Sequence, residues 1–231
     1  MTDKRTEEIA SRLSTVRRAI EKAATSAGRI PDGICLVAVT KTFPVDDARR
    51  LVALGVTELG ESRDREARGK AAEVADARWH FIGRLQRNKA ASVARYAEVV
   101  HSVDRMPLVA ALDAAAARAG RVIEVFCQVS LDGEPGRGGV DREALPELSD
   151  AVAAAGSLRL SGLMAVPPPG ADADAAYADI ARIADRIRAR HPEASGLSAG
   201  MTADFPTAIR YGATHVRIGS ALLGRRPAHL G

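Results

Sequence analysis

A short apolar run that ends in a lysine is the stretch from which the fold is read: Leu36-Val37-Ala38-Val39-Thr40-Lys41-Thr42. Its branched residues, and the proline that follows at position 44, predict a buried strand over residues 34–40 that stops at a turn. Side chains alternate along a strand, so Val37, Val39 and Lys41 should share one face. Desolvation over an apolar floor favours the neutral lysine amine, which is a nucleophile toward aldehydes. A strand-end lysine can also simply reach solvent, so the other strands must decide between these interpretations.

Length and composition are those of a globular chain with a sizeable core. The 231 residues suit one large domain or two small ones, and 46% of them are hydrophobic. Aromatic residues make up only 3%, which argues against nucleic-acid binding by base stacking. The net charge is +4, but the 33 basic and 29 acidic residues are interspersed, and no basic block exceeds a pair such as Arg17-Arg18. This mixed surface is typical of a protein without a nucleic-acid partner.

Neither a membrane span nor a signal peptide is indicated. The first twenty residues are charged and helical, and no apolar run approaches the roughly 18 residues that a span needs. We therefore expect a cytoplasmic protein. Cys35 and Cys127 each lie in an apolar run and are interpreted as small core residues. No metal site is predicted, because ligand spacing is lacking among the histidines His80, His101, His191, His215 and His229.

Strand and helix patterns alternate from residue 34 onward. Strands are predicted at 34–40, 58–60, 79–82, 99–103, 122–129, 158–164, 196–199 and 215–218. Helices are predicted near 45–54, 62–76, 86–96, 105–119, 141–155, 172–190 and 203–211, with a short terminal helix. Eight such units in about 200 residues fit a parallel (β/α)8 barrel. A doubly wound open sheet is the alternative, but it would need a Gly-rich turn after the first strand, where Lys41 to Pro44 stand instead.

An additional helix precedes this alternation, over residues 4–27. Its apolar residues recur at three- and four-residue steps and form one stripe, made of Ile9, Leu13, Val16 and Ile20. Such a stripe must pack on something, and the barrel is the body available. No break in composition follows, so residues 1–231 are expected to form a single (β/α)8 TIM-barrel domain with an N-terminal helix at 1–28.

The strand ends are where chemistry is expected, because (β/α)8 barrels place their active sites at the C-terminal face and often hold phosphate after strands seven and eight. Gly200-Met201-Thr202 should open a helix after the seventh strand, and Gly219-Ser220 should open another after the eighth. Each offers backbone N–H groups at a helix N-terminus plus a hydroxyl, which suits a phosphate dianion. Taken singly, each could be an ordinary helix cap. Together they favour a phosphate site.

Arg217 should point into the same mouth. Its guanidinium cannot give up a proton, so it could pair with a carboxylate such as Glu61, contact phosphate, or donate to a ring nitrogen. A lysine that binds aldehydes, placed opposite a phosphate cradle, has two obvious partners. One is a sugar phosphate, as in Schiff-base aldolases. The other is pyridoxal 5′-phosphate (PLP), which carries an aldehyde and a phosphate on one ring.

Six segments spread over nearly the whole chain form a recognisable set. They are residues 38–42, 60–61, 79–89, 162–168, 197–204 and 216–220. The most specific is the string Trp79-His80-Phe81-Ile82-Gly83-Arg84-Leu85-Gln86-Arg87-Asn88-Lys89. In these segments the chain resembles the YggS/PROSC family of pyridoxal-phosphate homeostasis proteins, which have the alanine-racemase-type PLP-binding barrel without that enzyme's second domain.

The resemblance implies a role for several residues. Lys41 would form the covalent PLP aldimine, and Arg217 would sit near the pyridine nitrogen. The other contacts to the cofactor would come from Thr202, Gly219, Ser220, Met201 and Ser62. Ser62 stands where the family usually has an asparagine, and its shorter side chain puts a contact to the ring in question.

An arginine beside the ring nitrogen cannot accept the ring proton, which weakens the ring as an electron sink. We therefore expect a protein of intracellular PLP homeostasis that holds PLP as a lysine Schiff base without robust catalysis. A PLP-dependent amino-acid racemase of low activity is the alternative, and a cofactor-free sugar-phosphate lyase is a third. Racemisation needs an acid–base group on each face of the substrate, whereas Tyr96, Tyr177 and Tyr211 all fall in predicted helices. A monomer in transient contact with PLP-requiring apoenzymes is expected.

Overall fold

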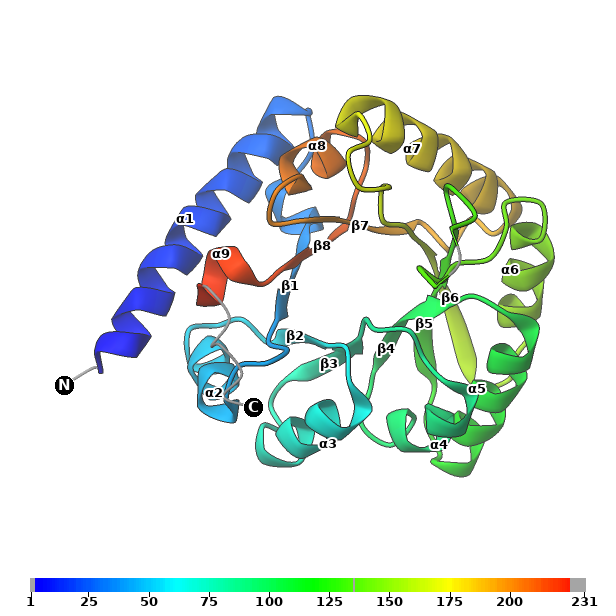
Figure 1. Ribbon diagram of the computed structural model, residues 1–231, viewed down its shortest axis with the longest axis horizontal. Coiled ribbons are helices and arrows are strands. Elements are labelled where there is room, and N and C mark those ends of the chain that lie inside the picture. Colours follow the sequence, from blue (N-terminus) through cyan, green and yellow to red (C-terminus); the bar gives the residue numbers. More distant parts are fainter. Residues whose placement is uncertain (1–2, 135, 225–231) are drawn as a thin grey trace.

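The computed structural model describes residues 3–134 and 136–224, and this part of the chain forms a closed barrel of eight parallel strands (Figure 1). Each strand pairs with the next one along the chain, and the last pairs with the first. The strands are β1 (Cys35–Val39), β2 (Glu58–Glu61), β3 (Arg78–Phe81), β4 (Val99–Val103), β5 (Ile123–Gln128), β6 (Leu158–Met164), β7 (Gly196–Met201) and β8 (His215–Ile218). The predicted (β/α)8 barrel is therefore confirmed.

Helices lie on the outside of the barrel: one precedes the first strand, one follows the last, and the others connect successive strands, as parallel pairing requires. They are α1 (Lys4–Ser26), α2 (Val45–Ala53), α3 (Asp64–Glu73), α4 (Ala90–Val93), α5 (Met106–Arg118), α6 (Leu145–Ala153), α7 (Ala173–Arg190), α8 (Phe205–Arg210) and α9 (Ser220–Leu223), with the 3-10 turns η1 (Pro31–Gly33) and η2 (Arg87–Lys89). No helix in the described ranges is long and apolar enough to cross a membrane. His229 lies outside the described residues.

The helix predicted over residues 86–96 is wrong in extent. Only the turn η2 and the four-residue helix α4 form there. Ala90 and Val93 are buried and give α4 a face toward the core, whereas the four residues before it are polar and exposed. Because a short helix gains its stability from packing, these residues, which have no face to bury, form no more than the turn η2.

The helix expected to open at Gly200-Met201-Thr202 is also wrong. Gly200 and Met201 still belong to β7, and α8 begins only at Phe205. Gly200 has a φ of +95°, and a Cβ there would lie 2.6 Å from the Cβ of Ala208. Gly200 thus lets the chain turn tightly against α8, and it does not begin that helix.

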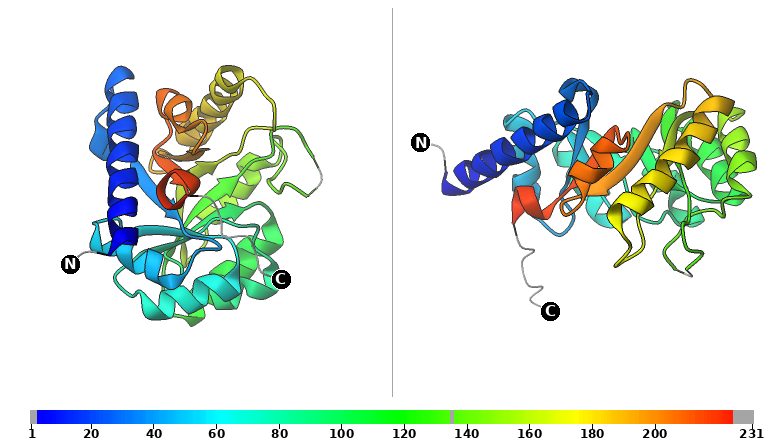
Figure 2. Two further views of the ribbon diagram at one scale, coloured as in Figure 1. Left: turned by 60° about the vertical axis from the view of Figure 1, so that its left-hand side comes forward. Right: turned by 90° about the horizontal axis from the view of Figure 1, so that it is seen from above.

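Helix α1 lies along the outside of the barrel, beside α8 and α9 (Figures 1 and 2). Its buried face contains the predicted stripe, extended by one alanine: Ile9, Leu13, Val16, Ile20 and Ala24. Arg5 donates two hydrogen bonds to the buried carboxylate of Asp47 in α2, at 3.2 and 2.6 Å. Arg29 donates to the carbonyl oxygens of Ile209 and Ala213, both at 2.7 Å. The segment before the barrel therefore binds both the first and the last units of the ring.

The side-chain rings of one phenylalanine and three histidines pack together inside the barrel. Phe126 of β5 stacks on His101 of β4 with 4.7 Å between centroids, and it meets the edge of His215 of β8 at 4.9 Å. His80 of β3 lies 5.1 Å from His101. Three histidines that are far apart in the sequence thus meet inside the barrel. Among the residues that the structure describes, no group of histidine, cysteine and acidic side chains could hold a metal ion.

A buried ion cluster lies directly behind the loop that follows β1. Lys70 of α3 is 5% exposed, and its amine donates to Glu61 at 2.6 Å and to Glu66 at 2.8 Å. The same amine donates to the carbonyl oxygen of Thr40 at 2.7 Å, and the Thr40 hydroxyl donates to Glu61 at 2.7 Å. Burial raises the pKa of Glu61, against the opposing effects of Lys70 and Thr40.

This cluster sets the backbone on both sides of Lys41. On the N-terminal side of Lys41, Thr40 is hydrogen-bonded to Lys70 and Glu61. On the C-terminal side, the Thr42 N–H donates to Glu66 at 2.5 Å. Thr42 has a φ of +70°, a conformation that is rare and costly for a β-branched residue. We infer that the ion cluster stabilises this conformation, which turns the chain just after Lys41.

Replacing Lys70 by methionine should lower the free energy of unfolding by about 3–5 kcal/mol, because Glu61 would lose the cation that compensates its burial. Urea denaturation measures the change. The variant Lys22→Met, at an exposed position of α1, is the matched control and should stay within about 0.5 kcal/mol of the parent. Adding Glu61→Gln to Lys70→Met should restore part of the loss. If Lys70→Met unfolds like Lys22→Met, the cluster does not have this role.

Candidate functional site

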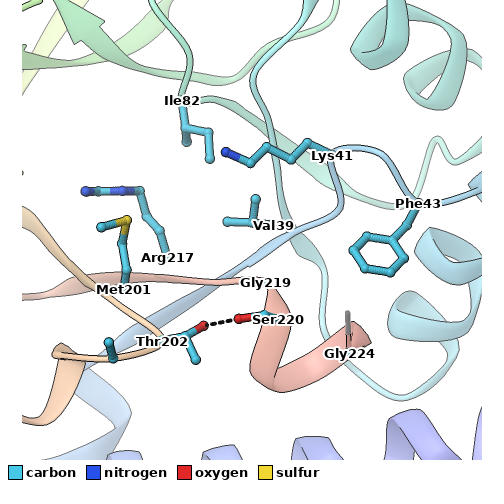
Figure 3. Close-up of a pocket in the computed structure, with 11 residues that line it drawn as sticks. Val39, Lys41, Phe43, Ile82, Met201, Thr202, Arg217, Gly219, Ser220 and Gly224 are labelled. Carbon is cyan, nitrogen blue, oxygen red and sulfur yellow. Dashed lines mark hydrogen bonds between the residues drawn. The ribbon is translucent and has the colours of Figure 1, made fainter. Parts of the chain in front are cut away.

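A cavity of about 280 Å³ opens at the C-terminal ends of β1, β7 and β8 (Figure 3). This volume is just below the range of about 300–1,000 Å³ that is typical of small-molecule sites. Its lining comprises Val39, Lys41, Phe43, Ile82, Met201, Thr202, Ala203, Arg217, Gly219, Ser220 and Gly224. The cavity thus lies at the face of the barrel where the strand ends were expected to carry the chemistry.

Lys41 enters the cavity from the turn after β1. The strand ends at Val39, so Lys41 lies two residues beyond it rather than on the same strand face. The side chains of Val39 and Lys41 nevertheless both line the cavity. Figure 3 shows the Lys41 side chain extending over Val39 toward Ile82. Its surroundings are largely apolar, and the residue is half-buried.

Arg217 of β8 is the second charged side chain of the cavity, and it is 5% exposed. It donates to the hydroxyl of Ser198 at 2.6 Å and to the carbonyl oxygen of Ala165 at 3.3 Å. These bonds use two of the five N–H donors of the guanidinium. Burial lowers the pKa of Arg217 to about 10, so it stays protonated at neutral pH. The alternative of an ion pair with Glu61 is wrong, because Glu61 binds Lys70 and Thr40 instead.

Two hydroxyls from different loops meet at one side of the cavity. The Ser220 hydroxyl donates to the Thr202 hydroxyl at 3.3 Å (Figure 3). Gly219 begins the turn into α9, and a Cβ there would lie 3.2 Å from the Val39 carbonyl oxygen. The N–H groups of Ser220 and Ala221 precede the first bonds of this helix, which the Leu222 and Leu223 N–H groups make to the Gly219 carbonyl oxygen at 3.0 and 2.9 Å. Hydroxyls and N–H groups of this kind can bind an anion.

Met201 and Ser62 are placed differently from these residues. Met201 lines the cavity edge and is 43% exposed, but its N–H is bound to the carboxylate of Asp204 at 2.7 Å. Ser62 is not among the lining residues, and its carbonyl oxygen packs against Gly83, where a Cβ would lie 2.2 Å away. A cofactor contact by Ser62 remains a prediction.

Four residues of the lining were not predicted from the sequence to be site residues: Phe43, Ile82, Ala203 and Gly224. Phe43 and Ile82 each lie shortly after the end of a strand. Counting the residues that directly follow each strand as site candidates would have included both. Both give the cavity apolar walls beside Lys41, as Figure 3 shows.

Among the described residues that line the cavity, Lys41 supplies the one amine nucleophile, and no second acid–base group accompanies it. Among its described lining residues, only Lys41 and Arg217 have an ionisable side chain, and arginine does not exchange its proton near neutral pH. The tyrosines lie elsewhere: Tyr96 donates to Asp64, Tyr211 donates to Asp174, and Tyr177 is buried. The arrangement can therefore bind an aldehyde and an anion but offers one proton-transfer group.

Comparison with known proteins gives the same family along nearly the whole chain. Residues 12–227 match the family model described as alanine racemase, N-terminal domain. A pyridoxal phosphate homeostasis protein of Mycobacterium tuberculosis is 41% identical, over 96% of this chain and 94% of that protein. A protein of the same name from Pseudomonas aeruginosa is 40% identical, over 94% and 96% of the two chains.

Solved structures show the same relationship. PipY of Synechococcus elongatus, whose structure has PLP bound, superposes with a TM-score of 0.79 at 33% identity, covering 94% of this chain and all of PipY. Alanine racemase of Corynebacterium glutamicum shares the fold, with a TM-score of 0.71 at 19% identity over 97% of this chain and 63% of the racemase. The chain therefore belongs to the family of pyridoxal phosphate homeostasis proteins, whose barrel is that of the alanine racemase N-terminal domain.

Proposed function

We propose that this chain binds PLP in the cavity at the end of β1 and β8, and that it serves PLP homeostasis by holding the cofactor without turning over a substrate. The observation that supports this most directly is that Lys41, Arg217 and the Thr202–Ser220 pair line one cavity. The names of the relatives, and the PLP in the PipY structure, point to the same ligand.

The residues present fit each functional group of PLP. When bound, PLP supplies an aldehyde carbon and an electron-withdrawing pyridine ring. The Lys41 amine is the nucleophile for the aldehyde, and the Thr202 and Ser220 hydroxyls with the backbone at Gly219 suit the phosphate. Gly219 lets that backbone approach closely, since a side chain there would press on Val39.

Lys41 would hold the cofactor reversibly. Its amine would hold the aldehyde carbon of PLP through a bond whose formation releases one water molecule and whose hydrolysis consumes one, so the cofactor could be released again. Met201, at the edge of the cavity, and Ser62, outside its described lining, are also proposed to contact PLP.

Arg217 would set the character of the bound ring. A guanidinium donates hydrogen bonds but accepts none, so it binds a ring nitrogen that carries no proton. A ring without that proton is a poorer electron sink, which favours holding the cofactor over catalysis. The absence of a second acid–base group in the described lining acts in the same direction, and it disfavours the racemase alternative.

We also propose that the protein acts as a monomer and passes PLP to apoenzymes by transient contact. The open side of the cavity, where Met201 is exposed, is the route by which the cofactor would enter and leave.

Loading the protein with PLP should give a yellow absorption band that Lys41→Ala abolishes, because the covalent bond needs the amine. Borohydride reduction followed by mass spectrometry should place the pyridoxyl group on the peptide containing Lys41. Lys89→Ala, at an exposed position after β3, is the matched control and should keep the band. A Lys41→Ala protein as yellow as the Lys89→Ala protein contradicts the proposal.

Removing the hydroxyls with Thr202→Val and Ser220→Ala should weaken PLP binding by about tenfold or more each, since hydrogen bonds to a charged group contribute about 1.5–3 kcal/mol. Affinity for pyridoxal, which lacks the phosphate, should change less than about twofold, since it makes no such bonds. Titration with both ligands measures the ratio. Thr15→Val, on the exposed face of α1, controls for the substitution itself. Equal losses for the two ligands would refute a phosphate role.

Incubation of the PLP-loaded protein with L-alanine should produce D-alanine no faster than free PLP at the same concentration, because the described lining offers an acid–base group to only one face of the substrate. Chiral chromatography measures the product. Turnover near 1 s⁻¹ or above, in the range of ordinary enzymes, and its loss in Lys41→Ala, would favour the racemase instead.

A further inference from the structure

A continuous line of polar side chains, buried except at its far end, Glu58, crosses the barrel behind the cavity. It starts at Arg217, whose guanidinium donates to the Ser198 hydroxyl at 2.6 Å. The Ser198 oxygen lies 2.7 Å from Nδ1 of His101, and Nε2 of His101 lies 2.8 Å from Nδ1 of His80. Nε2 of His80 contacts the carboxylate of Glu58, at the start of β2. The five residues come from five strands, and the three in the middle are 1% exposed or less.

If both rings are neutral, the two ends of this line determine where every proton lies. Arg217 can only donate. Burial alone would raise the pKa of Glu58, but its bonds to His80 and Arg78 outweigh this and keep the pKa below its ordinary value, so Glu58 is a carboxylate that only accepts.

Every bond therefore runs in one direction. Ser198 accepts from Arg217 and donates its O–H to Nδ1 of His101. His101 then carries its proton on Nε2 and donates to His80. His80 carries its proton on Nε2 and donates to Glu58. In this arrangement both rings are neutral, and each bond along the line has one donor and one acceptor.

A protonated ring would break this order. With two N–H groups, His80 would force His101 to accept at Nε2 and to donate from Nδ1 to Ser198. The Ser198 oxygen would then accept hydrogen bonds from both His101 and Arg217, and its own O–H would lose its acceptor, the His101 ring. In addition, a second positive charge would lie near the guanidinium. The line therefore accommodates one cation only, at Arg217.

The charged groups around the rings agree with neutral imidazoles. His80 faces Glu58, Arg78 and Glu98, while His101 faces the cations Arg78 and Arg217 and the ring of His215. Burial lowers the pKa of His80, and it lowers that of His101 further, with help from the neighbouring rings and arginines. Burial also lowers the pKa of His215, to about 4.

We propose that Ser198, His101 and His80 are positioning residues for Arg217: through one fixed direction of hydrogen bonding they hold the guanidinium so that its remaining N–H donors face the ring nitrogen of PLP, and they keep a second positive charge away from it. This inference rests on the proposed function for the identity of the ring. The packing of the barrel does not require it, since apolar side chains of similar volume fill such interiors without the desolvation that polar groups incur.

The tautomers can be observed directly in the PLP-free protein. With ¹⁵N-labelled histidine, long-range ¹H–¹⁵N spectra should show His80 and His101 as neutral Nε2–H tautomers at pH 7. They should remain so as the pH is lowered past 6.5, the ordinary histidine pKa. His80→Gln and His101→Gln spectra assign the signals. A neutral Nδ1–H tautomer, or a cation at pH 7, at either ring overturns the proposal, whether or not PLP binds.

A second experiment tests the effect on the ring nitrogen. The parent should bind PLP about tenfold or more tightly than the analogue with C–H in place of the ring nitrogen. Ser198→Ala should reduce this preference at least threefold, and Ser198→Thr should restore it. Ser149→Ala, at a serine equally buried but in α6, should leave it unchanged. A preference that is the same in Ser198→Ala and the parent overturns the proposal, while failure of both ligands to bind the parent refutes only the proposed function.

Discussion

The pairing of β1 with β8 is the constraint on which the whole cavity depends. In its register Val37 lies opposite Arg217 and Ala38 lies opposite Ile218. The residues that follow, Lys41 on one strand and Gly219-Ser220 on the other, are thereby brought to the same mouth from opposite ends of the chain. All strands of a parallel barrel run in the same direction, so closing the ring is sufficient to bring an amine from the first unit to a hydroxyl from the last.

Each charged side chain of the cavity is supported by its own buried polar network. Lys70 and Glu66 of α3, together with Glu61 at the end of β2, set the backbone around Lys41. The line from Ser198 to Glu58 runs through the interior and sets Arg217. Burying a charge is unfavourable unless it is paired, and each network contains charges of opposite sign: Lys70 with Glu61 and Glu66 in one, and Arg217 and Glu58 at the two ends of the other. The two charges that face a ligand are thus oriented before it arrives.

Local patterns predicted much of the fold to the residue. The strands β4, β6 and β8 have the predicted bounds, because each is a short, largely buried run rich in branched aliphatic residues. The failures lie where tertiary contacts override the local pattern. Gly200 looked like the start of a helix, but its positive φ serves a tight approach to Ala208. The histidines looked scattered because spacing along the chain says nothing about distance across a barrel.

The sequence by itself determined the order of strands and helices and the chemical groups at the strand ends, since periodicity, glycine and proline act locally. Only the tertiary structure decided which of those groups share a cavity. It brought in Ile82, left out Ser62, and bound the Met201 N–H to Asp204. The physical reason is that a side chain beyond a strand end points where the loop backbone directs it. That backbone depends on distant partners, such as those that hold Thr42 at a positive φ, and no local period encodes them.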